Sequence, residues 1–217
     1  MNKSLKSFFA GLAFLFGLPW LVAIVLPWWS YYTLNRVAYD AADSAPDTYY
    51  PPVRPGLALG AEVYARSGCA YCHTQMVRPS YAGADVWRPG WGGREQQKLA
   101  RETRPNDYVG ESFAFLGMAR VGPDLSNVGS RIKDASWHYK HLFSPRSVKE
   151  ESVMPAYRNL FEKRMVTGLG TKEAVATQEE KGIRYEFVPS NEARALVEYL
   201  LTMRKDHKLP GKLVSTK

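Results

Sequence analysis

The sequence predicts a mainly α-helical protein, with one N-terminal transmembrane helix followed by a domain of helices and long loops. A run of 29 residues without a single charge, at 7–35, predicts the membrane helix. A clear amphipathic pattern near the C-terminus predicts a packed helix in the following domain. No alternation of apolar and polar residues is clear enough to predict a strand, so we expect no β-sheet.

Composition and charge narrow the function classes. The chain has 217 residues, the usual size of one or two domains, and 23% of them are charged. Its 29 Lys and Arg against 21 Asp and Glu leave a net charge of +8, which suits anionic lipid, an acidic partner protein or simply a basic surface. The sequence has no zinc-finger spacing, RNP-like motif or recognition-helix signature, which argues against nucleic acid.

The charge-free run is long enough to cross a membrane. As a helix it would reach ~43 Å, more than the ~30 Å of a hydrocarbon core. Pro19 and Pro27 predict a kink or an early end, and membrane helices tolerate proline better than soluble ones. Aromatic residues cluster near the end of the run, as in an interfacial belt: Trp28, Trp29, Tyr31 and Tyr32. A cleaved signal peptide is the alternative, but it would have a shorter apolar run followed by small residues.

Flanking charges predict the orientation of this helix. Lys3 and Lys6 precede it without any acidic residue, whereas Arg36 after it is followed by three aspartates within 40–47. The positive-inside rule then places the N-terminus in the cytoplasm and the rest of the chain outside. We therefore expect a single-pass membrane protein, and in a bacterium the two sides would be the cytoplasm and the periplasm of the inner membrane.

The remaining chain divides by composition. Residues 1–35 form the cytoplasmic tail and membrane helix, 36–55 a linker rich in Pro, Tyr, Ala and Asp, 56–206 the main domain, and 207–217 a basic tail. Within the main domain, 79–122 is rich in loop-forming residues, with a short polar helix possible from Arg94 to Thr103. Residues 165–188 are polar and aperiodic, and we expect them to form a surface excursion.

Three helices are expected in the main domain. The first runs from Leu57 to Ser67 and ends at Gly68, and the second runs over 135–143 after the capping residue Asp134. The third begins after Ser190 and runs to about 204. Its apolar residues fall on one helical face: Leu196, Val197, Leu200 and Leu201.

Both cysteines of the chain lie in one motif, Cys69-Ala70-Tyr71-Cys72-His73. A thioredoxin-like redox pair would need a βαβ context, which the sequence lacks. A zinc site would need two further ligands, and His138 and His141 do not have the usual spacing. A disulfide between the two cysteines would close only a very small loop and restrict little of the unfolded chain.

Covalent attachment of c-type haem is the fourth interpretation. Two thioethers fix the porphyrin edge, and the imidazole of the next residue can then take the proximal iron site. The motif also occurs by chance, but the absence of other cysteines and the predicted export favour haem. We therefore expect one covalently attached haem c, bound by Cys69 and Cys72, with His73 as an iron ligand.

A methionine would complete the six-coordinate iron. Met203 belongs to the last helix and is expected in its core. Met154 precedes Pro155 in a rigid extended segment that can lay its thioether against the second haem face. Met154 is therefore our candidate for the second iron ligand. His138 and His141 remain alternatives for a bis-histidine site.

The order of CxxCH, Gly122-Pro123-Asp124-Leu125 and Met154-Pro155 resembles a class I cytochrome c. The resemblance implies a class I cytochrome c-like haem domain with long loop insertions. It implies that the Pro123 carbonyl accepts a hydrogen bond from His73, and that Arg131 lies near a haem propionate. It further implies that two earlier residues, Gly60 and Tyr64, pack against the last helix near Leu196 and Tyr199.

A narrower resemblance covers residue 1 to about 157 and the final helix. The stretches that carry it are YARSGCAYCHTQMVRP, GPDLSNVGSR, WHYKHLFSPRSV and ESVMPAY. They resemble the monohaem subunit II (CcoO/FixO-like) of cbb3-type cytochrome c oxidases. That family's subunit takes an electron from a cytochrome c, often through a dihaem partner subunit, and passes it to haem b of the large haem–copper catalytic subunit. The resemblance implies these partners and no catalytic residue in this chain, because oxygen is reduced elsewhere.

Two stretches depart from the family pattern, at 113–120 and in an elongated insertion over 87–104. Both are candidates for subunit contacts. Three rival functions share parts of the same motif: a self-standing membrane-anchored electron carrier, a haem enzyme or sensor with an open iron site, and a thiol or zinc membrane protein without haem.

Overall fold

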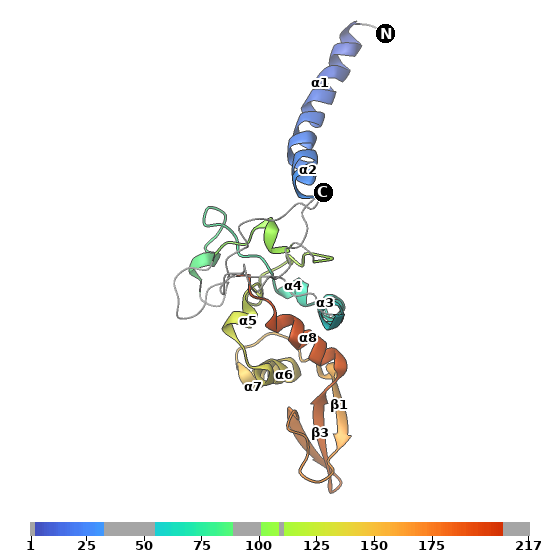
Figure 1. Ribbon diagram of the computed structural model, residues 1–217, viewed down its shortest axis with the longest axis vertical. Coiled ribbons are helices and arrows are strands. Elements are labelled where there is room, and N and C mark those ends of the chain that lie inside the picture. Colours follow the sequence, from blue (N-terminus) through green and yellow to red (C-terminus); the bar gives the residue numbers. More distant parts are fainter. Residues whose placement is uncertain (1–2, 33–54, 89–100, 109–110, 206–217) are drawn as a thin grey trace, which may run out of the picture. The chain divides into compact units, whose positions relative to one another are not determined.

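The computed structural model describes residues 3–32, 55–88, 101–108 and 111–205 (Figure 1). The chain divides into two compact units, an N-terminal helical unit and a main unit, Ala45–Leu209. The predicted basic tail at 207–217 lies outside the described residues, as do nearly all of the linker at 36–55 and most of the polar helix at 94–103.

The N-terminal unit contains one long helix, consistent with a single membrane anchor. It consists of α1 (Lys3–Trp20), a π-helical turn η1 (Leu21–Val25) and α2 (Leu26–Tyr31). The segment Ser4–Ser30 is long and apolar enough to cross a membrane, and none of the most apolar part of it is buried against the rest of the chain. Because the helix continues through both prolines, the early end that they suggested does not occur.

The longest helices of the main unit, α3 (Pro55–Arg66) and α8 (Asn191–Leu201), cross in close contact. A Cβ added to Gly60 would clash with the Ala195 carbonyl and lie 2.6 Å from the Tyr199 Cβ atom. The Tyr64 and Tyr199 ring centroids lie 5.6 Å apart at the same crossing. The expected packing of Gly60 and Tyr64 against the last helix is therefore confirmed. Only a glycine allows the two helix backbones to approach this closely.

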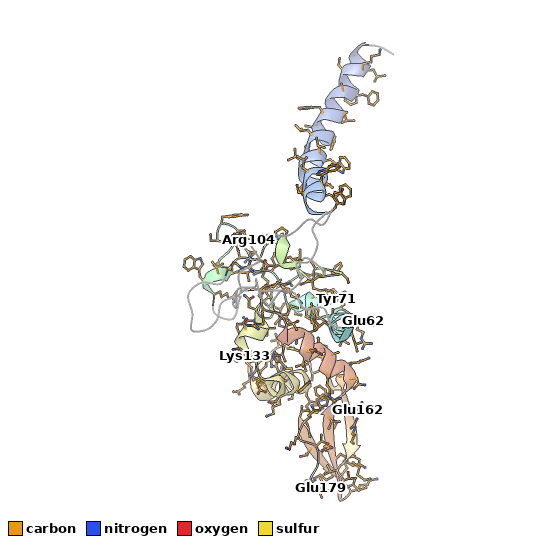
Figure 2. All side chains as sticks on the ribbon, in the orientation of Figure 1. Glu62, Tyr71, Arg104, Lys133, Glu162 and Glu179 are labelled. Carbon is orange, nitrogen blue, oxygen red and sulfur yellow. The ribbon has the colours of Figure 1, made fainter. Side chains whose placement is uncertain are left out.

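Gly60→Ala is expected to lower the free energy of unfolding by about 1–3 kcal/mol, because the added methyl group forces α3 and α8 apart. Thermal and denaturant unfolding of the purified full-length chain would measure the change. Glu62→Ala, at an exposed position of the same helix (Figure 2), is the control and should leave stability nearly unchanged. An unchanged Gly60→Ala variant would contradict the close crossing.

Shorter helices make up much of the rest of the described main unit. They are α4 (Cys69–Cys72), η2 (Asp85–Trp87), η3 (Pro105–Tyr108), α5 (Val128–Arg131), α6 (Ala135–Phe143), α7 (Pro145–Val148) and η4 (Arg158–Leu160). α6 begins and ends where the sequence predicts. The Asp134 carboxylate accepts the Ser136 N–H at 2.9 Å, and the helix stops before Ser144-Pro145.

The prediction that the chain has no β-sheet is wrong. Three antiparallel strands, β1 (Phe161–Met165), β2 (Ala176–Glu180) and β3 (Ile183–Pro189), form a sheet in the order β1-β3-β2. In register, Phe161 pairs with Pro189 and Ala176 with Phe187. The sheet occupies most of the predicted surface excursion at 165–188 and extends away from α8 and α6 (Figure 1).

The sheet was hard to predict because it is mostly solvent-exposed. β1 and β2 have exposed residues along nearly their whole length. Only the base of the sheet enters the core, where the Phe143 ring of α6 lies 5.2 Å from Phe161 and 5.0 Å from Phe187. Such strands carry little hydrophobic alternation. The two-residue turn between β2 and β3 was a better indication of the hairpin than the strands themselves. Its residues, Lys181 and Gly182, both adopt positive φ, as a type I′ turn requires.

Candidate functional site

The two cysteines lie on a single helical turn directly after α3. Gly68 ends α3 in the left-handed conformation, with φ of 73°, and α4 begins at the next residue. Cys69 is buried and Cys72 exposed, and both thiols are free. Tyr71, between them, is 64% exposed and is labelled in Figure 2. The chain then turns into an extended conformation at His73.

The Cys69 thiol is held in its neutral form. Burial raises its pKa to about 11, well above that of an exposed thiol. Redox exchange and zinc binding both use the thiolate, which this environment disfavours. Across residues 3–32, 55–88, 101–108 and 111–205, no group of three or more His, Cys, Asp or Glu side chains could hold a metal ion. The surroundings of the cysteines therefore do not favour a thiol–zinc or thiolate redox site.

His73 is oriented by the loop that contains Pro123. Its Nδ1 atom lies 2.7 Å from the Pro123 carbonyl oxygen, so Nδ1–H donates and the Nε2 lone pair is free to bind a metal. Burial lowers the pKa of His73 and outweighs the opposite effect of this hydrogen bond. The imidazole is thus neutral at pH 7, the form that ligates metals.

Backbone hydrogen bonds hold residues 116–125 around the cysteine turn. Met118 N–H donates to the Ala70 carbonyl and Gly122 N–H to the Cys72 carbonyl, both at 2.9 Å. A Cβ on Gly122 would overlap the His73 ring, because it would lie 2.8 Å from Nδ1 and closer still to Cε1. The Gly-Pro-Asp-Leu motif therefore needs a glycine at this position, because any side chain would collide with the imidazole.

Arg131 ends α5 and contacts the same loop. Its Nη2 donates to the Asp124 carbonyl oxygen at 2.6 Å. The Asp124 side chain is buried. It accepts hydrogen bonds from Thr74 and Met76, which follow His73, and from Ser126 in its own loop. Pro123 thus lies in the loop against His73, and Arg131 bonds to that loop from the end of α5.

Met154 lies in the segment between α7 and η4, outside the helices and strands, and packs against the same hydrophobic core as Cys69. It is half-buried, and its N–H faces the Ser152 hydroxyl at 3.3 Å. Tyr157 fixes the end of this segment. Its N–H donates to the Leu142 carbonyl at 2.8 Å, and its hydroxyl donates to the Ser67 carbonyl at 3.2 Å, one residue before the turn into α4.

The two histidines of α6 differ in their surroundings. His138 is buried, with Nε2 3.0 Å from the Ile132 carbonyl, which is a structural hydrogen bond. His141 stacks on Trp137, with ring centroids 4.7 Å apart. Burial, and then the charge of His73, lower the pKa of His141 to about 4, so His141 lies within electrostatic reach of His73 and is neutral at pH 7.

The residues after His73 are fixed by buried polar contacts. Gln75 is fully buried, and its side-chain amide exchanges hydrogen bonds with the Tyr199 hydroxyl at 3.1–3.2 Å. Tyr108 donates to the Gln75 carbonyl at 2.7 Å. The Met76 carbonyl accepts from Arg120 at 2.8 Å. The segment Thr74–Met76 is therefore bonded to α8, to η3 and to the loop that contains Arg120.

Asp85 joins the segment after Met76 to the loop that contains Arg120, because it binds one arginine from each. It is 3% exposed, accepts the Arg78 guanidinium at 2.9 Å and accepts Arg120 at 2.5 Å. Burial alone would raise its pKa, but the two guanidinium groups outweigh this effect and hold the pKa at about 2. Asp85 therefore stabilises the fold at neutral pH as a carboxylate.

Asp85→Asn is expected to lower the free energy of unfolding by about 1–2 kcal/mol at pH 7. Since the folded-state pKa lies below the ordinary value, wild type loses this contribution as the pH falls from about 4 towards 2, and the two proteins should converge there. Denaturant unfolding across this pH range measures both effects. Glu162→Gln, at an exposed ion pair with Arg164, should cost much less. A constant difference between wild type and Asp85→Asn at every pH would contradict this role.

Sequence reasoning missed the parts that Gln75, Asp124 and Tyr157 play. All three stand inside the stretches that carried the resemblance, yet each acts through a partner about 50 to 120 residues away. Tyr157 had one readable signal, because a tyrosine directly after a rigid Met-Pro segment is well placed to anchor it. The buried partners of the other two are fixed only by the tertiary fold.

Comparison with known proteins supports an assignment. The family model described as cytochrome c oxidase, mono-heme subunit/FixO, matches residues 50–209, which include every candidate site residue. No curated protein matches the chain.

Proposed function

Because the chain belongs to the FixO family of mono-haem cytochrome c oxidase subunits, we propose that it is the membrane-anchored electron-transfer subunit of a cbb3-type oxidase. It would take electrons from a cytochrome c donor or a dihaem subunit. It would deliver them to haem b of the large catalytic subunit, where oxygen is reduced. The haem, once bound, supplies reversible one-electron chemistry at its iron.

One arrangement carries the proposal: two free cysteines on a single helical turn, followed by a histidine whose Nδ1 lies 2.7 Å from the Pro123 carbonyl. This contact leaves Nε2 as the metal-binding atom and makes it more basic. The residues therefore fit a covalently attached haem c. Cys69 and Cys72 would anchor it by thioether bonds, and His73 would be the proximal ligand.

Exposed apolar side chains beside the cysteine turn fit the same group. Met118 is 77% exposed and Val121 62% exposed, in the loop whose backbone is bonded to residues 70 and 72. The Nδ1 atom of His141 is buried, and no hydrogen-bond partner for it lies within the described residues. A haem would suit these groups. Its large, mostly apolar ring would cover Met118 and Val121, and its propionates would supply hydrogen-bond acceptors near Nδ1 of His141.

Met154 is our candidate for the second iron ligand, and Arg131 for the neutralisation of a propionate. The Tyr157 hydrogen bonds support the first assignment, because they hold the Met154 segment against the start of the cysteine turn. We propose that the main unit has the class I cytochrome c-like fold expected above, with the three-stranded sheet as an addition. With both axial positions filled by the protein, no small molecule need bind the iron.

The N-terminal helix would place the haem domain beside its partner. We propose that it crosses the bacterial inner membrane with the N-terminus in the cytoplasm and the haem domain in the periplasm. Anchoring in the same membrane replaces free diffusion by a high effective concentration. This favours a permanent subunit over the self-standing carrier, although both would use the same haem residues.

Purification from native membranes, followed by a visible spectrum and identification of the co-purifying chains, tests the proposal. We expect a c-type haem spectrum and a stable complex with a haem–copper catalytic subunit. A c-type haem on a chain that purifies without such a subunit would favour the self-standing carrier. Carbon monoxide binding to the reduced haem c at neutral pH would favour an open-site enzyme or sensor.

A further inference from the structure

We propose that Asp124 is a positioning residue for His73, and that its buried negative charge lowers the reduction potential of the iron that His73 would bind. The inference rests on the proposed function, because it concerns the potential of a haem bound there. It adds a residue to which the haem-binding motif assigned no role.

The Asp124 carboxylate joins the two segments whose contact orients His73. It is fully buried, and its Oδ2 accepts the Thr74 hydroxyl at 2.5 Å and the Met76 N–H at 2.9 Å. Its Oδ1 accepts the Ser126 N–H at 2.8 Å. Thr74 directly follows His73, and Asp124 directly follows Pro123. The carboxylate therefore braces both ends of the His73–Pro123 hydrogen bond.

Only a carboxylate matches this set of partners. Both of its oxygens face backbone N–H groups, and an ionised carboxyl accepts on both oxygens. In an asparagine of the same shape, the amide nitrogen would face one of those N–H donors. A buried N–H would then lose its partner, at a cost of about 1–3 kcal/mol. The site therefore selects aspartate over its closest isostere.

The charge of Asp124 also reaches the imidazole. Thr74, Met76 and Ser126 supply uncharged donors to its carboxylate oxygens, whereas the charged Arg131 guanidinium donates to its backbone carbonyl at 2.6 Å. The carboxylate is held one residue beyond Pro123, whose carbonyl oxygen lies 2.7 Å from Nδ1 of His73. A negative charge at this place stabilises ferric over ferrous iron and thus lowers the potential. Without it, the field of Arg131 would act alone in the opposite direction.

Asp124→Asn in the purified, haem-loaded complex is the test. We expect the haem to stay attached and the midpoint potential of the haem c band to shift upward in a redox titration. We also expect faster hydrogen exchange at either the Met76 or the Ser126 backbone amide, since the asparagine nitrogen would face one of the two and that amide would lose its acceptor. An unchanged potential or unchanged exchange in the haem-bearing variant would overturn the proposal.

Asp134→Asn is the matched control, because it removes one carboxylate charge at the exposed start of α6, where asparagine caps a helix as well as aspartate does. Its potential should equal that of wild type. Should Asp124→Asn fail to accumulate, T74V keeps the charge and removes one donor that partly screens it. Its potential should then shift downward, and an upward shift or none would overturn the proposal.

These outcomes separate the inference from the proposed function. A wild-type chain without covalent haem in denaturing electrophoresis would overturn both. Haem on every variant, with the potential of Asp124→Asn equal to wild type, would overturn the role of Asp124 alone.

Discussion

Replacing Cys69 and Cys72 together by alanine is expected to abolish covalent haem, so that the chain gives no haem stain after denaturing electrophoresis. Denaturation breaks the coordination bonds to iron, and only thioether bonds keep haem on a polypeptide. The chain contains no other cysteine to replace the pair. We expect oxidase turnover with a cytochrome c donor to fall by at least about tenfold in the same membranes.

Tyr71→Ala is the control for the double variant. Tyr71 stands between the cysteines, and its side chain is mostly exposed, so its loss should leave the stain intact. Immunodetection of the chain on the same gel normalises the amount of protein. A stained double variant would contradict attachment at this turn.

Met154→Leu has the second-largest expected effect. Leucine has a similar volume but no donor atom, so the iron would become five-coordinate or take another ligand. We expect a lower midpoint potential, loss of the methionine–iron absorption band and carbon monoxide binding to the reduced protein. The potential falls because a thioether favours ferrous iron.

Met165→Leu serves as the matched control, because Met165 is 59% exposed on β1 and far from α4 in the chain. It should leave the spectrum and potential unchanged. An intact methionine–iron band in Met154→Leu would remove Met154 from the site. A bis-histidine spectrum in the wild-type protein would instead point to the α6 histidines, of which His141 lies within electrostatic reach of His73.

The sequence predicts well those features that are local in the chain. The charge-free run, the Asp134 cap of α6 and the apolar face of α8 all depend on neighbouring residues, and the structure has these elements at nearly the predicted bounds. The crossing at Gly60 is not local. It was anticipated only because the family resemblance supplied the long-range partner.

The sheet was missed for a physical reason. Hydrophobic alternation marks a strand when one face is buried, and here burial reaches only the base of β1 and β3. Ile183, Tyr185 and Phe187 do alternate with charged residues in β3. That alternation, with the Lys181-Gly182 turn, was the available signal for a hairpin.

The candidate site likewise has some residues that the sequence predicts and others that it does not. The motif itself names the cysteines and His73, and the resemblance names Pro123, which the fold brings to 2.7 Å from the imidazole. The contacts of Thr74, Gln75 and Met76 could not be predicted from the sequence, because their partners Asp124 and Tyr199 lie 48 to 124 residues away in the chain.

Single-turnover oxidation of the purified complex tests the central claim most directly. The fully reduced complex would be mixed with oxygen, and the absorption bands of haem c and haem b followed in time. The account predicts that the haem c band decays as electrons reach haem b, at a rate no slower than turnover. A haem c that stays reduced while the enzyme turns over would contradict an electron-transfer role for this chain.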